Sequence, residues 1–124
     1  MGKSIKPDAI VWVHPFGAEV PIFDDIDRMD RFYRKRWGIK TDWDRATFGT
    51  AGRCYDKNGV ARYALFIPST ANLGLIVHEC SHIVDFVMHE CGVPISLKNT
   101  EVRAYMLATL FCDVCHVLNR GDDE

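Results

Sequence analysis

The chain of 124 residues is long enough for one domain with a substantial core and too short for two such cores. Its residues are 48% hydrophobic and 26% charged, as in ordinary folded proteins, and its net charge of -2 excludes a general attraction to nucleic acid or anionic membrane. No apolar stretch approaches the ~20 residues of a membrane span, and no signal peptide is evident, so we expect one cytoplasmic domain over residues 1–124 with no nucleic-acid or membrane partner.

The first third of the chain contains the patterns of a strand and a helix. Residues Ala9 to Val13 are rich in β-branched and aromatic side chains and are followed by Pro15, which predicts a strand that ends there. From residue 24 to Trp37, apolar side chains recur at steps of three and four, which predicts an amphipathic helix with Gly38 as its C-terminal stop. We interpret the basic segment inside this helix, Arg31 to Trp37, as a face exposed to solvent.

The next segment, residues 47–67, has the pattern of a hairpin. Asn58 and Gly59 form the pair that type I′ turns favour, because both central residues of such a turn need positive φ. The arm before the turn is rich in glycine, whereas the arm from Val60 to Ile67 is strongly β-forming. We therefore predict two antiparallel strands joined at this pair.

Two further helices complete the predicted set. The first begins between residues 69 and 72 and ends near Cys91, where Gly92 and a following proline stop it. The second opens at Asn99 or Thr100, and its dense apolar positions predict a mostly buried element. The order strand, helix, hairpin, helix, helix predicts an α+β domain with one layer of helices on one sheet.

The segment His78-Glu79-Cys80-Ser81-His82 lies inside the first of these two helices. Histidines four residues apart project from one helix face, because one turn takes ~3.6 residues. Their imidazoles can bind one Zn²⁺ together, and the intervening glutamate is then placed to act on a metal-bound water. The alternative is a buried helix whose histidines are satisfied by neighbouring polar groups, since so short a motif also arises by chance.

A catalytic zinc of this kind needs a third protein ligand and an open position for water. The extended HExxHxxGxxH pattern does not apply, because Asp85 stands at its glycine position and Met88 at its third histidine position. The other solution is a glutamate from the following helix, and Glu101 lies in the first turn of that helix. We therefore predict a Zn²⁺ site formed by His78, His82 and Glu101.

The HExxH motif, the short connection and Glu101 together resemble the compact gluzincins, thermolysin-like metallopeptidases reduced to a small domain. They are also similar to small phage- and prophage-encoded metallopeptidases and to the catalytic segment of the ImmA/IrrE proteases. The resemblance covers about residues 60–115. It implies a zincin-like (minigluzincin) fold, with a short antiparallel or mixed sheet packed on the HExxH helix and on the Glu-bearing helix. It also implies that residues 62–67 form the sheet edge where extended substrate docks. Thermolysin itself has an aspartate four residues after the glutamate ligand, as a hydrogen-bond partner for a metal-binding histidine, and Tyr105 occupies that position here.

Other polar side chains are candidates for supporting roles. An oxyanion of a tetrahedral intermediate needs a donor or cation, and the candidates are Tyr105, Tyr63, Arg103 and His14. Tyr105 is preferred because it lies one turn after Glu101. Asp85 and His89 share the helix face of the histidine pair, so they are expected either to orient a metal-binding histidine or to form a buried polar pair.

Five cysteines cannot pair completely within the chain, and we expect free thiols in a reducing compartment. Cys112 to His116 has the formal CxxCH spacing of covalent haem attachment, but that chemistry requires export and the motif lies inside a predicted helix. We therefore expect these cysteines to pack in the core. A second metal site made of cysteines lacks the usual second CxxC pair.

These observations predict a zinc-dependent metallopeptidase acting on a peptide or protein substrate, with a catalytic core over about residues 60–118. Zinc would polarise the scissile carbonyl and lower the pKa of its bound water toward ~7. Glu79 would take the proton of that water and pass it to the leaving amine, with Tyr105 assisting. The alternative is a non-enzymatic, metal-stabilised interaction protein, such as a phage accessory or host-binding module with the same scaffold. The third possibility is an inactive protein with this fold that binds no metal.

Overall fold

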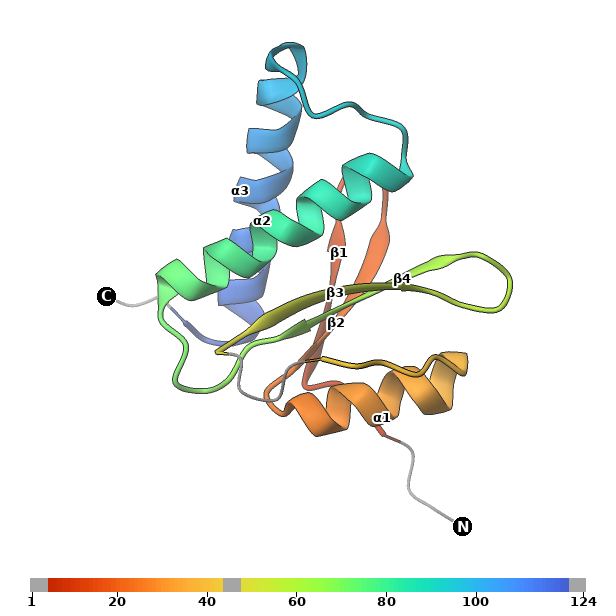
Figure 1. Cartoon of the computed structure of the whole chain (residues 1–124). Coiled ribbons are helices and arrows are strands. Elements are labelled where there is room, and N and C mark those ends of the chain that lie inside the picture. Colours follow the sequence, from red (N-terminus) through yellow and green to blue (C-terminus); the bar gives the residue numbers. More distant parts are fainter. Residues whose placement is uncertain (1–4, 44–47, 121–124) are drawn as a thin grey trace.

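The computed structural model describes residues 5–43 and 48–120, which form an α+β domain with a four-stranded sheet and three α-helices (Figure 1). In chain order the elements are β1 (Ala9–Val13), β2 (Ala18–Phe23), α1 (Ile26–Trp37), β3 (Thr50–Tyr55), β4 (Ala61–Phe66), α2 (Leu73–Glu90), the 3₁₀ turn η1 (Leu97–Asn99) and α3 (Thr100–Val117). None of these helices is long and apolar enough to cross a membrane.

The sheet is mixed, and its strand order is β1-β2-β4-β3. β1 and β2 form an antiparallel hairpin, and β3 and β4 form a second one along their whole length. The two hairpins join through a short parallel contact between β2 and β4, where Ile22 pairs with Leu65 and Phe23 with Phe66. The α+β class is thus confirmed, and of the two kinds of sheet that the resemblance implied, antiparallel or mixed, the structure has the mixed one.

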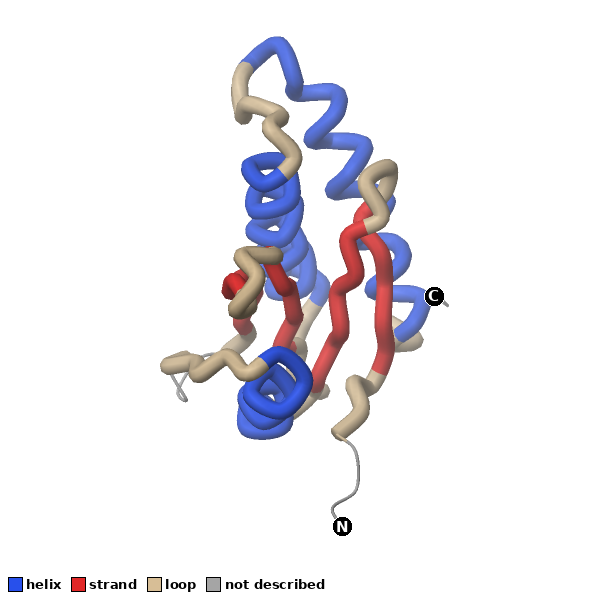
Figure 2. The backbone as a smooth tube through the Cα atoms, turned by 90° about the vertical axis from the view of Figure 1, so that its right-hand side faces the viewer, coloured by secondary structure: helices blue, strands red, loops and turns tan. Residues whose placement is uncertain are grey.

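Helices cover both faces of this sheet, so the predicted single helix layer is wrong. α1 packs on one face, and α2 and α3 pack on the other (Figures 1 and 2). The reason lies in β4, which is buried on both sides. Tyr63 and Leu65 belong to the core beneath α2 and α3, whereas Ala64 and Phe66 belong to the core beneath α1. Burying both faces of a strand requires a helix on each side.

Strand β2 was not predicted from the sequence. Pro21 interrupts its pattern, and proline usually argues against a strand inside a sheet. The parallel contact with β4 begins only at Ile22, so Pro21 lies outside that ladder and its missing N–H removes no bond from it.

The β3–β4 hairpin is confirmed, but its turn differs from the prediction. Gly59 has φ +78°, whereas Asn58 does not have positive φ, so the turn is not type I′. The Asp56 N–H donates to the Val60 carbonyl at 3.0 Å, which closes a loop of three residues. The Asp56 carboxylate accepts from the Asn58 and Val60 amides at 2.9 and 3.1 Å, and it thereby stabilises this wider turn. Thr47, where the predicted hairpin began, lies outside the described residues.

The predicted sheet edge at residues 62–67 is also wrong. β4 lies between β2 and β3, and the strand at the edge is β3. The cause is the tight hairpin, which folds β3 along the whole outer side of β4. Any docking by strand addition therefore has to use β3.

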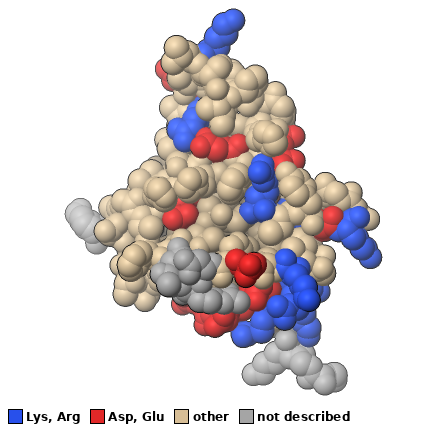
Figure 3. Space-filling model, viewed as in Figure 1, with Lys and Arg blue, Asp and Glu red and all other residues tan. Residues whose placement is uncertain are grey.

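Helix α1 has the boundaries that its sequence indicates. The Asp25 carboxylate accepts from the amides of Asp27 and Arg28 at 2.8 and 3.2 Å, and Gly38 ends the helix with φ +68°. The basic side chains near its C-terminal end are exposed, as expected for a solvated face, and they gather at the lower right of Figure 3. They favour the negative end of the helix dipole.

Helix α2 is capped by Asn72, whose side chain accepts from the Leu75 amide at 2.8 Å, in agreement with the sequence. Helix α3 is less buried than predicted. Its buried apolar residues begin at Met106, whereas Val102 is 38% exposed and Tyr105 is 58% exposed. The first turns of α3 extend past α2 instead of lying over the sheet (Figure 1).

Candidate metal centre

His78 and His82 lie on the exposed face of α2 with their rings at 84° and their ring centroids 4.8 Å apart. Their Nε2 atoms are 3.3 Å apart. Two zinc–nitrogen bonds of about 2.0–2.1 Å at a tetrahedral angle place the two nitrogens about 3.3–3.4 Å apart. The pair therefore fits two positions of one tetrahedral metal ion without a change in the helix.

Neighbouring side chains set the orientation of His82. Its ring stacks on Phe86, one turn further along α2, with centroids 6.4 Å apart and planes at 23°. Phe86 in turn lies beneath the guanidinium of Arg53 from β3, at 4.7 Å. The helix is thus connected to the edge strand through Arg53 and Phe86, and this contact limits the rotamers open to His82.

Glu79 points away from the solvent and is only 6% exposed. Within residues 5–43 and 48–120, no hydrogen bond or ion pair involves its carboxylate. A Cβ on Gly49, just before β3, would lie 3.4 Å from the Glu79 Cγ, so the chain passes close over this side chain. An open groove of about 440 Å³ reaches it, lined by Phe48, Gly49, Gly74, Leu75, His78 and Glu79. The arrangement suits a carboxylate that exchanges protons with a molecule in the groove.

Glu101, the predicted third ligand, is exposed in the first turn of α3. The neighbour that contacts α2 is Arg103, whose Nε donates to the Asp85 carboxylate at 2.7 Å. Two residues along a helix correspond to a rotation of about 200°, so Glu101 is on the far side of α3 from this contact. Among the described residues, no group of three His, Cys, Asp or Glu side chains lies close enough together to hold a metal ion. The structure brings the histidines together and does not bring Glu101 to them.

Asp85 and His89 make other contacts than either of the two that the sequence predicts. Asp85 forms an ion pair with Arg103, and His89 is exposed with its Nδ1 3.2 Å from an Arg53 guanidinium nitrogen. They therefore neither orient a metal-binding histidine nor form a buried pair with each other.

The oxyanion candidates are in different environments. Tyr105 is exposed on α3, four residues after Glu101, and His14 is exposed in the turn between β1 and β2. Tyr63 is 7% exposed, and burial is the main cause that raises the pKa of its phenol to about 12. Arg103 is engaged by Asp85, which is the main cause that raises its pKa.

All five cysteines lie in the described part of the chain, and none of them forms a disulfide there, as expected. Cys80 and Cys115 are buried, whereas Cys112 is exposed, so the CxxCH segment packs into the core through one cysteine only. Burial, with smaller effects of Cys115 and Glu79, raises the pKa of the Cys80 thiol to about 12. At neutral pH this side chain is a packed, protonated thiol.

Sequence reasoning missed Gly49, Arg53 and Phe86 as parts of the site. The HExxH spacing carries no information about β3, because contacts between a strand and a helix depend on how the sheet is assembled. Phe86 was recognisable as lying four residues after His82, a spacing at which side chains meet on a helix. Arg53 and Gly49 carried no comparable signal.

No protein-family model, curated protein or solved structure matches this chain. The resemblance to gluzincins therefore rests on the HExxH motif and the position of Glu101. Zinc binding and peptidase activity stay predictions.

Proposed function

We propose that this protein is a zinc-dependent metallopeptidase with a zincin-like fold. The observation that carries the proposal is the 3.3 Å separation of the His78 and His82 Nε2 atoms, which matches two ligands of one tetrahedral ion. A hydrogen bond between two neutral imidazoles explains the same distance, but it does not explain a buried glutamate next to this pair. Glu101 is the third ligand in this proposal, and its approach requires the first turn of α3 to turn away from the Asp85–Arg103 contact.

Zinc, when bound, supplies a Lewis acid that polarises a carbonyl and acidifies a coordinated water. Glu79 provides the proton chemistry. Its carboxylate lies at the inner wall of the groove and has no described hydrogen-bond partner that would compete for a proton. It accepts a proton from water in the groove and donates it to the leaving amine. The contact of Gly49 with the Glu79 side chain limits the positions of this carboxylate.

The substrate in this proposal is an extended peptide that pairs with the β3 edge. The Asp56–Val60 bond defines which residue pairs of the hairpin are hydrogen-bonded, and the pairs alternate along the strands. Ala51, Arg53 and Tyr55 therefore direct their main-chain N–H and C=O groups to the open side of β3. A peptide bound there runs along the strand that covers Glu79 at one end and contacts α2 through Arg53 at the other.

The test is zinc content and peptide hydrolysis in two glutamate variants. Glu79→Gln is expected to keep zinc and lose activity by about 10²–10⁴-fold, because it removes the general base and no ligand. Glu101→Gln is expected to lose both zinc and activity. Glu19→Gln in β2 is the matched control and leaves both unchanged. Zinc loss in Glu79→Gln together with retention in Glu101→Gln would show that the two roles are assigned wrongly.

The second candidate is a metal-stabilised interaction protein without catalysis. It is favoured by exposed apolar side chains around the start of α3, where Ile95 is 60%, Leu97 is 89% and Tyr105 is 58% exposed. In that case zinc-loaded protein cleaves none of a broad peptide mixture, and Leu97→Ser reduces partner binding while Glu79→Gln does not. Peptide hydrolysis that depends on Glu79 rejects this candidate.

A further inference from the structure

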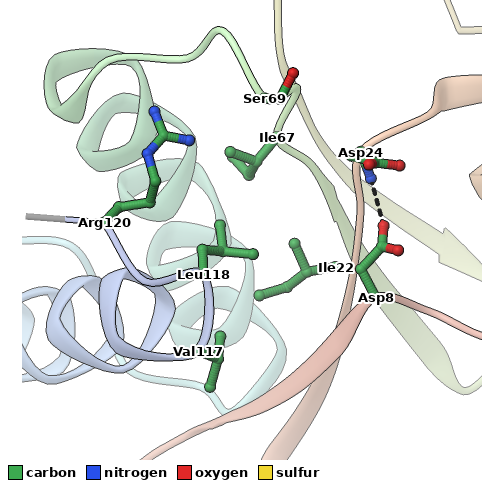
Figure 4. Close-up of a pocket in the computed structure, with 8 residues that line it drawn as sticks. All are labelled: Asp8, Ile22, Asp24, Ile67, Ser69, Val117, Leu118 and Arg120. Atoms are coloured by element: carbon green, nitrogen blue, oxygen red, sulfur yellow. Dashed lines mark hydrogen bonds between the residues drawn. The ribbon is translucent and has the colours of Figure 1, made fainter.

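A second cavity lies away from the histidine pair, beyond the C-terminal ends of β2 and β4. Its volume is about 410 Å³, within the range of small-molecule sites, and it is lined by residues that follow these two strands and by the end of α3 (Figure 4). β2 and β4 are the parallel pair of the sheet. The carboxyl ends of parallel strands are a frequent place for ligands, because the chain diverges there and leaves a crevice.

One end of this cavity is acidic. Asp8 accepts from the Asp24 amide at 2.7 Å, and both carboxylates contact the guanidinium of Arg28. One arginine serves two carboxylates, so this group of three side chains retains one negative charge. The contacts hold Asp8 and Asp24 at the right of the cavity in Figure 4, and Asp24 remains 60% exposed and open to a ligand.

The other end is cationic. Asn119 has φ +56°, and the Arg120 amide donates to the Cys115 carbonyl at 2.8 Å, which turns the chain back after α3 and places Arg120 at the cavity. The Arg120 guanidinium forms no ion pair with any described residue. Ser69 lies between the two ends, above Ile67 in Figure 4, and its hydroxyl adds a hydrogen-bond donor to the lining.

Between the two charged ends, the cavity is apolar. Ile22 and Ile67 from the strand side and Leu118 from the end of α3 separate the acids from the arginine (Figure 4). A ligand complementary to this surface has an ammonium group at one end, a carboxylate at the other and an apolar body between them.

We propose that this cavity binds a dipeptide of apolar residues, whose ammonium and carboxylate groups lie at opposite ends of the molecule. The carboxylate pairs with Arg120, the ammonium group pairs with Asp8 and Asp24, and the side chains contact Leu118 and the isoleucines. Binding here does not depend on the metal or on the proposed peptidase activity.

The experiment is an NMR titration of the ¹⁵N-labelled full chain in the form in which it is purified. The titration is repeated with EDTA, so that binding of the ligand to a metal ion is not mistaken for binding to this cavity. Leu-Leu is the zwitterionic probe, and L-leucine, whose two charged groups lie on one carbon atom, is the control that is too short to reach both ends. Leucyl-leucinamide lacks the carboxylate, and 4-methylpentanoyl-leucine lacks the ammonium group. We expect Leu-Leu to shift the amide signals of Asp24, Ser69 and Arg120, and L-leucine and each one-ended probe to bind about tenfold more weakly or worse.

Charge-removing variants supply the second arm. Arg120→Gln and Asp24→Asn are expected to weaken zwitterion binding about tenfold, whereas Arg31→Gln and Asp42→Asn, which remove exposed charges elsewhere, leave it unchanged. Folding of each variant is checked by its amide spectrum. The proposal is overturned if Leu-Leu does not shift these signals at tens of millimolar, if leucyl-leucinamide and 4-methylpentanoyl-leucine bind as well as Leu-Leu, or if the shifts fall on the His78 region instead.

Discussion

The proposed binding of zinc to the histidine pair has a testable consequence for stability. Because the two Nε2 atoms already lie 3.3 Å apart, the metal would bind without rearrangement of α2. At a free zinc concentration 100 times Kd, binding to the folded state alone stabilises it by about 2.7 kcal/mol. One kcal/mol raises Tm by about 3–6 °C in a domain of this size. We therefore expect zinc to raise Tm by roughly 8–16 °C, measured by calorimetry after chelation and reloading.

Two histidine variants test where this stabilisation arises. Both side chains are exposed, so His78→Ala and His82→Ala are expected to change the stability of the metal-free protein by no more than about 0.5 kcal/mol. Each should nevertheless remove most of the zinc-dependent rise in Tm. His89→Ala is the matched control, because its side chain is also exposed on α2 and takes no part in the pair. The metal-free protein should still unfold cooperatively, since the core does not depend on the site.

The reasoning is refuted if zinc raises Tm equally in a His78→Ala/His82→Ala double variant, which would place the metal elsewhere. It is refuted as well if the parent shows no rise at any zinc concentration. Loss of all folded structure on chelation would instead indicate a structural metal, as in zinc fingers.

Three further predictions concern the sheet and the packing of α1 and β3. Tyr33→Phe removes a buried hydroxyl that donates to the Arg62 carbonyl at 2.9 Å, and we expect a loss of about 1–3 kcal/mol in urea unfolding; an unchanged midpoint would contradict the bond. Gly52→Ala places a Cβ 2.9 Å from the Trp43 ring, so it should destabilise the folded protein by about 1–3 kcal/mol in urea unfolding. A stabilised variant would show that this ring moves freely. Burial raises the pKa of Tyr63 from 10.0 to about 12, so its contribution to stability is present below pH 10 and is lost as pH rises toward 12. Tyr63→Phe should therefore lose less stability over this pH range than the parent protein, as measured by denaturant unfolding at a series of pH values. An equal dependence of the unfolding free energy on pH in the two proteins would exclude Tyr63 as the source.

The sequence by itself determined the elements that local physics controls. The 3.6-residue period, the Asn72 cap and Gly92 define α2, and they place His78 and His82 on one face whatever surrounds the helix. The hairpin of β3 and β4 was likewise readable from its turn residues, although the carboxylate of Asp56 changed the turn type. These features depend on residues only a few positions apart.

Only the tertiary structure decided how these elements meet. Strand β2 forms by pairing with β4, and the sequence does not predict this pairing because Pro21 interrupts the strand pattern. The pairing places β4 inside the sheet, so β3 becomes the edge strand that lies over Glu79. The rotation of α3 that presents Arg103 to α2, and not Glu101, depends on its ion pair with Asp85. Such choices are made by contacts between residues distant in the chain, where a rotation of one helix exchanges one side chain for another without altering any local pattern.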